Sequence, residues 1–241
     1  MAVQREYGGW QSPALGRGME YLVLGHAGAR VLVFPSSQGR FYEWEDFKMA
    51  DALADQLERG WLQLFCVDSV DGESWYNDAV HPAVRAARHA QYDRYLIDEF
   101  VPYTASRNAN PFLIATGASF GAYHALAFAL RHPEHVGRVL GLSGLYDVRR
   151  FTNGFTNDDV YYANPFEFIQ HERDEARLAA MRRMDIILAI GRDDPSATNT
   201  VEMSRRLWEK GVGNALRLWD GWAHDWPYWK QMVRAYIGGH D

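Results

Sequence analysis

The chain has 241 residues, of which 47% are hydrophobic and 23% are charged, an ordinary composition for a globular protein with a sizeable core. Its formal net charge is −6 at pH 7 and it has no run of Lys or Arg, so we exclude nucleic acids and anionic membrane surfaces as partners. No apolar stretch approaches the roughly 20 residues that cross a bilayer.

Short apolar runs alternate along the chain with longer amphipathic stretches. In chain order, we predict strands at 21–26 and 29–36, a helix at 44–60, a strand at 62–69, a helix at 82–105, a strand at 112–118, a helix at 119–133, strands at 138–144 and 185–191, a helix at 198–211, a strand at 215–221 and a helix at 226–239. We expect the first two strands to be neighbours. Gly60 and Gly211 are typical C-caps for the helices that they end.

The predicted strands are apolar throughout rather than alternating, which indicates a sheet covered by helices on both faces. The order of strands and helices is typical of a doubly wound, mostly parallel sheet, so we predict an α/β fold of three layers, α/β/α. No repeat or linker divides the chain, so we expect one domain over 1–241. The longest excursion, 145–184, has a short helical piece near 173–183 and is too short for a large cap domain, although it can partly cover a site.

The N-terminal sequence and the cysteine content indicate the cellular compartment that we expect. The first residues, MAVQREYGGWQSP, contain no apolar run of the kind found in a secretory signal peptide. Cys66 is the only cysteine, and its apolar setting, WLQLFCVDSV, predicts a buried thiol that acts as a small hydrophobe. Both observations suit a reducing compartment, and we expect a cytoplasmic protein.

Residues 117–121 read GASFG and lie where an apolar strand meets an amphipathic helix. The pattern G-x-S-x-G is typical of a sharp turn on which a nucleophilic serine projects past the carboxyl edge of a sheet. Side chains at Gly117 and Gly121 would collide with the neighbouring strand and helix. We therefore predict that Ser119 is a nucleophile, and the alternative is a helix N-cap serine between packing glycines.

A serine hydroxyl is a weak nucleophile that needs a base, and the base needs an acid that orients it. In hydrolases with this turn, the chain order is serine, acid, histidine. The segment GRDDP, after a later strand, supplies Asp193 and Asp194, of which we favour Asp194; Asp147 is a further alternative in an earlier loop. His224 follows the last strand in WDGWAHDW, and we predict that it is the general base.

An oxyanion hole needs two backbone N–H donors. One belongs to the residue after the nucleophile, Phe120, and the other to the loop PSSQGRFYEW that follows an early strand. We choose the amide of Ser37, with Gln38 as the second choice. This chemistry needs no metal or organic cofactor, and no C-x-x-C, H-E-x-x-H or G-x-G-x-x-G pattern is present.

The other eight histidines lack the placement of His224. We expect His132 and His135 at a helix end, where a cation favours the helix dipole, and His124 as a packed or surface residue of the nucleophile helix. We expect a turn at a strand end for His26, and exposed helical or terminal positions for the rest: His81, His89, His171 and His240.

At these residues the chain resembles the "putative esterase" family of α/β-hydrolases, which includes esterase D enzymes, feruloyl-type esterases and secreted mycolyltransferases. The resemblance rests on VLVFPSS, CVDSVDGESWYND, GASFGAYHALAFALRHPEHVGRVLGLSG, GRDDP and GWAHDWPYWKQMV, in that order. It implies an α/β-hydrolase fold with Ser119 as nucleophile, Asp194 as acid, His224 as base, and oxyanion amides near Ser37 and at Phe120. The family's HG-rich oxyanion loop is replaced here by PSSQGR, and we carry over neither a glutathione nor a mycolyl substrate.

We therefore expect a serine carboxylesterase that hydrolyses short-chain or aryl esters through an acyl-enzyme. Aromatic faces suit apolar acyl or aryl groups. We expect the substrate to contact Gln38, Trp44, Trp75, Tyr76, Trp222 and Trp226. The alternatives are an acyltransferase or thioesterase with the same three side chains and, from another class, a non-catalytic binding protein on this fold. The expected partner is a small-molecule ester, and a homo-oligomer is left open.

Overall fold

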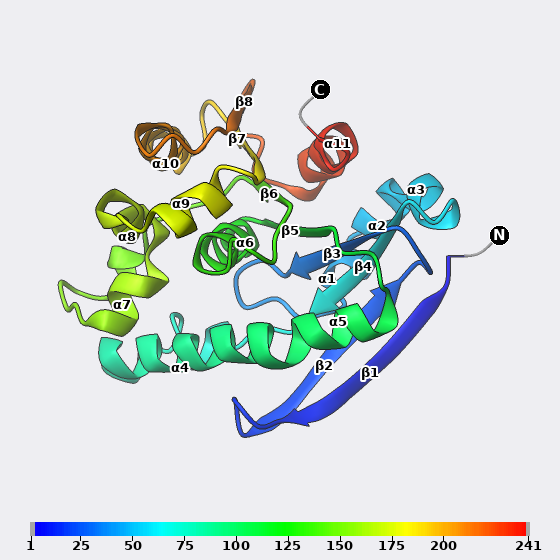
Figure 1. Ribbon diagram of the computed structural model, residues 1–241, viewed down its shortest axis with the longest axis horizontal. Helices are drawn as coiled ribbons and strands as arrows, with labels where there is room; N and C mark the ends of the chain where they lie inside the picture. Colours follow the sequence, from blue (N-terminus) through cyan, green and yellow to red (C-terminus); the bar gives the residue numbers. More distant parts are fainter. Residues whose placement is uncertain (1–2, 240–241) are drawn as a thin grey trace.

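The computed structural model describes residues 3–239, whose strands form one sheet (Figure 1). In chain order the strands are β1 Arg5–Ser12, β2 Arg17–Leu24, β3 Ala29–Phe34, β4 Leu62–Val67, β5 Leu113–Ala118, β6 Arg138–Leu142, β7 Asp185–Gly191 and β8 Ala215–Trp219. Their spatial order is β1-β2-β4-β3-β5-β6-β7-β8, with β1 and β2 antiparallel and all strands from β3 on parallel. The predicted mostly parallel sheet is confirmed, and the carboxyl ends of its parallel strands share one edge.

Helices cover both faces of the sheet (Figure 1). One face is covered by α1 Glu43–Asp46, α2 Met49–Ala52, α3 Ala54–Glu58 and α11 Trp226–Tyr236. The other is covered by α4 Pro82–Tyr95, α5 Val101–Arg107, α6 Phe120–Arg131, α8 Pro165–His171, α9 Glu175–Met181 and α10 Ala197–Glu209. The remaining short elements are η1 Asp71–Glu73, η2 Leu96–Phe100, η3 Val148–Phe151 and α7 Asp158–Ala163, which contacts α4.

The two-sided covering explains why the strands read as continuous apolar runs. In β3, Leu32 and Phe34 pack into the cluster on the α6 side, whereas Val31 and Val33 pack into the cluster beneath α1–α3 and α11. Successive residues of a strand point to opposite faces, so a strand with helices on both sides needs apolar residues at every position. Cys66 in β4 is buried as predicted, and burial raises the pKa of its thiol.

The N-terminal edge of the sheet differs from the prediction. The strands expected to be neighbours, β2 and β3, are separated by β4, which pairs with both. The antiparallel strand β1 was not expected, because its sequence REYGGWQS is only partly buried and does not form an apolar run. β1 pairs with β2 along its whole length and forms the outer edge of the sheet.

The helix predicted at 44–60 is three short helices instead. Lys48 adopts a left-handed backbone conformation with φ 63°, which ends α1 and starts α2, and a non-helical Leu53 separates α2 from α3. The helix predicted at 82–105 is continuous from α4 to α5 but contains one π turn, η2. This turn ends two residues before Pro102, whose ring excludes an ordinary helical approach to the carbonyl four residues earlier, so a wider turn relieves the clash.

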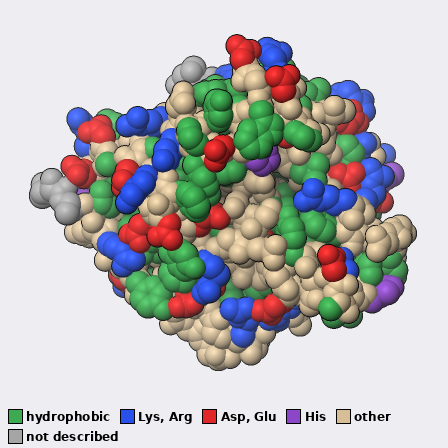
Figure 2. All heavy atoms as spheres, turned by 180° about the vertical axis from the view of Figure 1, so that it is seen from behind, with side chains coloured by type: hydrophobic (Ala, Val, Ile, Leu, Met, Phe, Trp, Pro, Cys, Tyr) green, Lys and Arg blue, Asp and Glu red, His purple; other side chains and the backbone are tan. Residues whose placement is uncertain are grey.

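The surface mixes charges of both signs. Figure 2 shows acidic and basic side chains interspersed on the face opposite to that of Figure 1, with hydrophobic side chains in several separate patches among them. Within residues 3–239, no helix is both long enough and apolar enough to cross a bilayer.

Candidate active site

Ser119 lies on a tight turn between β5 and α6, at the carboxyl edge of the sheet. Its backbone has φ 55° and ψ −118°, a strained conformation for a residue with a side chain. A Cβ at Gly117 would lie 2.4 Å from the carbonyl carbon of Gly121, and a Cβ at Gly121 would lie 2.5 Å from the carbonyl oxygen of Phe34. Both glycines are therefore required by backbone contacts, as the sequence pattern predicted.

His224 bridges Ser119 and Asp194 by hydrogen bonds. Its Nε2 lies 3.0 Å from the Oγ of Ser119, and its Nδ1 lies 2.6 Å from the Oδ2 of Asp194. A carboxylate oxygen accepts a hydrogen bond, so Nδ1 carries the proton in this pair and Nε2 is the acceptor that faces the serine hydroxyl. The side chain of Asp194 is 1% exposed and that of His224 is 22% exposed, so solvent reaches the imidazole but not the carboxylate.

Asp194, rather than Asp193, faces the imidazole. The second oxygen of Asp194, Oδ1, accepts the N–H of Ser196 at 2.7 Å, which orients the carboxylate so that Oδ2 meets His224. Asp193 is exposed. The other alternative, Asp147, lies after β6 as the N-cap of η3, where it accepts hydrogen bonds from Arg149.

The loop that carries His224 is fixed by close backbone contacts. A Cβ at Gly191 would lie 2.2 Å from the carbonyl oxygen of Trp222, so a glycine at the end of β7 lets the two loops meet. Ala223 adopts φ 43°, and its carbonyl accepts the hydroxyl of Ser143 at 3.0 Å. The same hydroxyl oxygen accepts the indole N–H of Trp229 at 3.0 Å. These contacts hold the residue immediately before His224.

The loop after β3 makes a hydrogen-bonded turn beside the nucleophile. The N–H of Gly39 donates to the carbonyl of Ser36 at 2.9 Å, and Gln38 at the third position of this turn has φ 57°. The N–H and the hydroxyl of Ser36 both bond to the buried carboxyl of Glu43, each at 2.7 Å. Burial raises the pKa of the Glu43 carboxyl, and the two bonds from Ser36 oppose that shift.

Some backbone N–H groups of the loop after β3 already donate hydrogen bonds within the protein, and others do not. The N–H of Gln38 donates to the Oδ2 of Asp71 at 3.1 Å, so the second-choice oxyanion donor is engaged elsewhere. Among residues 3–239, neither the amide of Ser37 nor that of Phe120 has a hydrogen-bond partner. Phe120 is the first residue of α6, where helix N–H groups point outward. These two amides are therefore free to donate to a bound oxygen.

Two of the predicted substrate contacts are wrong. The indoles of Trp44 and Trp75 are 1% and 0% exposed, and both lie inside hydrophobic clusters, so they offer no surface to a substrate. Trp44 falls on the inner side of the short helix α1, because the predicted long helix is broken. Trp75 packs against His89 and Phe151 instead.

The other predicted contacts are at least partly exposed, and their contact with a substrate stays a prediction. Trp222 is 50% exposed and its ring stacks on the imidazole of His224, with centroids 5.6 Å apart. Trp226 is partly exposed and stacks on Phe47 at 4.2 Å. The hydroxyl of Tyr76 donates to the Oγ of Ser37 at 2.8 Å. Gln38 is exposed.

Several residues around the site were missed by sequence reasoning. Phe151, from the excursion after β6, contacts the rings of both Tyr76 and Phe120. His89 is buried, which corrects the expectation that it is exposed. The signal was present: the buried positions of α4 recur at threes and fours and include His89. The expected place of His240 lies outside the described residues.

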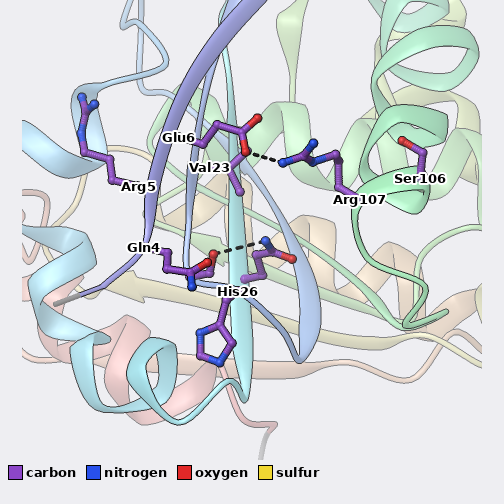
Figure 3. Close-up of a pocket in the computed structure, with 9 residues that line it drawn as sticks. Gln4, Arg5, Glu6, Val23, His26, Ser106 and Arg107 are labelled. Atoms are coloured by element: carbon purple, nitrogen blue, oxygen red, sulfur yellow. Dashed lines mark hydrogen bonds and ion pairs between the residues drawn. The ribbon is translucent and has the colours of Figure 1, made fainter. Parts of the chain in front are cut away.

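A hollow of the surface lies away from these residues. It has a volume of about 510 Å³, and Figure 3 shows it at the start of β1 and the end of α5. This is the amino edge of the parallel strands, opposite to the edge that carries Ser119. Its charged side chains are already paired, Arg107 with Glu6 and Arg5 with Glu45. The hollow therefore offers a ligand no unpaired charge from these side chains.

Three comparisons place the chain among known proteins. A family model described as "putative esterase" matches residues 31–237. A 1-acylglycerol-3-phosphate O-acyltransferase of Arabidopsis thaliana is 31% identical over 107 residues, which are 44% of this chain and 22% of that protein. The chain therefore spans about a fifth of the length of the curated relatives that it matches.

Solved structures share the fold at low sequence identity. A ferulic acid esterase superimposes with a TM-score of 0.78 at 17% identity, covering 97% of this chain and 96% of that one. An S-formylglutathione hydrolase from Agrobacterium tumefaciens superimposes with a TM-score of 0.75 at 13% identity, covering 98% and 94%. At these identities the likeness shows the fold alone.

Proposed function

Since the chain belongs to the "putative esterase" family of α/β-hydrolases, we propose that it is a serine carboxylesterase that uses Ser119, His224 and Asp194. It is a carboxylic ester hydrolase by family. The observation that supports the finer proposal is the unbroken series of hydrogen bonds from Asp194 through His224 to Ser119. Those three residues come from three loops at one edge of the sheet, and they match the roles of acid, base and nucleophile.

The first half of the reaction forms an acyl-enzyme. His224 Nε2 takes the proton from the Ser119 hydroxyl as the oxygen attacks the ester carbonyl carbon. The amides of Ser37 and Phe120 donate to the oxyanion of the tetrahedral intermediate. The intermediate collapses, the C–O bond to the alcohol breaks, and His224 gives its proton to the leaving oxygen.

The second half releases the acid. His224 takes a proton from water, which attacks the acyl carbonyl, and the same two amides stabilise the second oxyanion. Collapse of this intermediate breaks the bond to Ser119, whose oxygen recovers its proton from His224. Through both halves Asp194 holds the imidazole in one tautomer and stabilises the imidazolium that forms in each.

We propose short-chain or aryl esters as substrates. Two aromatic rings with exposed surface contact residues of the site: the exposed Trp222 stacks on His224, and the partly exposed Tyr76 contacts Phe120. Such faces favour flat or small apolar groups. The names of the two similar structures refer to a ferulic acid ester and a formyl thioester, which contain an aryl and a short acyl group respectively.

The test is a series of p-nitrophenyl esters of increasing acyl length, hydrolysed by the wild-type protein and by Ser119→Ala. We expect rapid release of p-nitrophenol from acetyl and butyryl esters and loss of this release in the variant. Turnover that is equal in the two proteins would contradict the proposal. The chain length at which the rate falls measures the depth of the acyl site.

Acyl transfer is the second candidate, and one observation favours it: the curated relative similar over 107 residues is an O-acyltransferase. Transfer would use the same acyl-enzyme, with an alcohol in place of water as the second nucleophile. Adding glycerol or a long-chain alcohol to the p-nitrophenyl ester assay separates the two. Ester product at the expense of free acid would favour transfer, and free acid alone would favour hydrolysis.

A further inference from the structure

Asp71 is a fully buried carboxylate that the proposed reaction does not use. It lies in η1, in the segment that follows β4, and it is 0% exposed. Its Oδ1 lies 2.8 Å from the Nε2 of His124, and its Oδ2 accepts the N–H of Gln38 at 3.1 Å. Burying a carboxylate costs free energy unless its oxygens are hydrogen-bonded. Here each oxygen has a partner, one from α6 and the other from the loop after β3, so the carboxylate links these two segments.

Asp71 also reaches Ser37 by a second route. Its backbone carbonyl accepts the N–H of Tyr76 at 3.0 Å, and the hydroxyl of Tyr76 donates to the Oγ of Ser37 at 2.8 Å. The side chain of Asp71 thus holds the residue after Ser37, and its main chain holds the tyrosine that bonds to the side chain of Ser37. The N–H of Ser37 lies between these two contacts and has no hydrogen-bond partner within residues 3–239.

His124 joins the two halves of the oxyanion site. It lies one turn along α6 from Phe120, and the two rings are 4.8 Å apart. Its other side stacks on Phe34, the last residue of β3 before the oxyanion loop, at 5.9 Å. The side chain is 2% exposed. Asp71 is therefore tied to the helix that carries the Phe120 amide and to the loop that carries the Ser37 amide.

We infer that Asp71, held by His124, is a positioning residue that aims the amide of Ser37 at the oxyanion. The inference rests on the proposed function. The turn at 36–39 contains Gln38 at φ 57°, a conformation that a residue with a side chain does not favour on its own. The carboxylate that accepts the N–H of Gln38 keeps the turn in that conformation and leaves the preceding N–H facing outward.

Three variants test the role of the carboxylate. Asp71→Ala removes both acceptors, and we expect kcat to fall about 10- to 100-fold with KM little changed, because an oxyanion donor acts on the transition state. Asp71→Asn keeps one oxygen for the N–H of Gln38 and an amide that can donate to His124, so we expect it to restore most of kcat. Asp93→Ala is the matched control, since Asp93 is also buried and also bonds to a histidine, His132 at 3.1 Å. Its loss should lower stability and leave kcat unchanged.

A double-mutant cycle separates positioning from a purely structural role. Ser37→Pro removes the proposed donor N–H at the second position of the turn, where proline is accepted, and should lower kcat about 10²- to 10³-fold. If Asp71 acts through that N–H, Asp71→Ala adds little to Ser37→Pro, since the donor is already lost. Multiplied effects of the two changes, or an Asp71→Ala protein that behaves like Asp93→Ala, would overturn the inference.

Hydrogen exchange of the Gln38 amide gives a readout that needs no turnover. We expect exchange to be about 10-fold or more faster in Asp71→Ala than in wild type and close to wild type in Asp93→Ala. Unchanged exchange of this amide in Asp71→Ala would overturn the inference even in an active enzyme. A wild-type protein that hydrolyses no ester would instead contradict the proposed function, and the exchange rates would still decide whether Asp71 holds the loop.

Discussion

Two aspartate–histidine pairs with similar N–O distances lie near the nucleophile turn, one bonded through Nδ1 and the other through Nε2 of the histidine. In one, Asp194 lies 2.6 Å from His224, and in the other, Asp71 lies 2.8 Å from His124. The histidine side chain is 22% exposed in the first pair and 2% exposed in the second. The remaining nitrogen of His224 faces a serine hydroxyl, whereas the other oxygen of Asp71 holds a backbone amide.

This difference shows that exposure and the third partner, rather than the pair itself, set the chemistry. A histidine that exchanges protons needs a group to take them from and access for substrate and water. A histidine enclosed by aromatic rings has neither, and its value is geometric. The following predictions test this division between a proton-transferring pair and a positioning pair, from the largest expected effect to the smallest.

Removing the base of the exposed pair should have the largest effect. In His224→Gln no group accepts the proton of Ser119, and we expect kcat to fall on the order of 10⁵-fold. Steady-state hydrolysis of p-nitrophenyl acetate measures this. His132→Gln, at the far end of α6, is the matched control and should keep wild-type kcat. If His224→Gln kept a tenth of the activity, the assignment of the base would be wrong.

The acid of the exposed pair should rank next. Asp194→Asn keeps the size of the side chain but places an amide beside Nδ1, which favours the wrong imidazole tautomer, and we expect a loss in kcat of about 10⁴-fold. Asp193→Asn changes an exposed neighbour and should keep kcat within about 2-fold of wild type. Equal losses in the two variants would overturn the choice between these aspartates. A larger loss in Asp147→Ala would do the same.

His89, a buried histidine that stacks on His124 of the buried pair, should stay uncharged in the folded protein. The pKa of His89 is lowered to about 3, chiefly by burial and in smaller part by the neighbouring His124, 5.5 Å away between ring centroids. Below pH 6.5 the unfolded chain then binds a proton that the folded protein does not, so the free energy of unfolding falls as the pH drops from 6.5 toward 3. The contribution lost at pH 5 is about 2 kcal/mol.

Urea unfolding at pH 8 and pH 5 measures this loss, with His89→Asn as the comparison. The variant lacks the titrating ring, so its free energy of unfolding should depend less steeply on pH over this interval. Carboxylates titrate in both proteins, and their contribution cancels in the difference between the two slopes. Parallel slopes would mean that His89 takes up its proton in the folded protein.

The exposed pair was predictable from sequence and the buried pair was not. Ser119, Asp194 and His224 each follow a strand, and a glycine allows close backbone approach at two of the three turns, so local patterns place them at one edge. Asp71 and His124 are 53 residues apart, and no local pattern in the sequence predicts that they meet, because a buried polar contact depends on how the segment after β4 packs against α6. The same dependence on packing explains the errors at Trp44 and Trp75, whose exposure is set by elements that the sequence pattern did not resolve.

Trp222 should give the smallest effect, and it tests what the exposed pair gains from its surroundings. Its ring lies at 23° to the imidazole of His224 and is 50% exposed, so it presents its free face beside the reacting atoms. If that face receives an acyl group, Trp222→Ala should lower kcat/KM for p-nitrophenyl benzoate about 3- to 10-fold more than for the acetate, because an aromatic contact is lost only with the first. Trp208, which is 59% exposed on α10, is the matched control, and Trp208→Ala should leave the ratio unchanged. An equal fall for both esters in Trp222→Ala would instead mean that the indole steadies the imidazole and does not touch the substrate, which would move acyl recognition to the partly exposed rings of Tyr76 and Phe151.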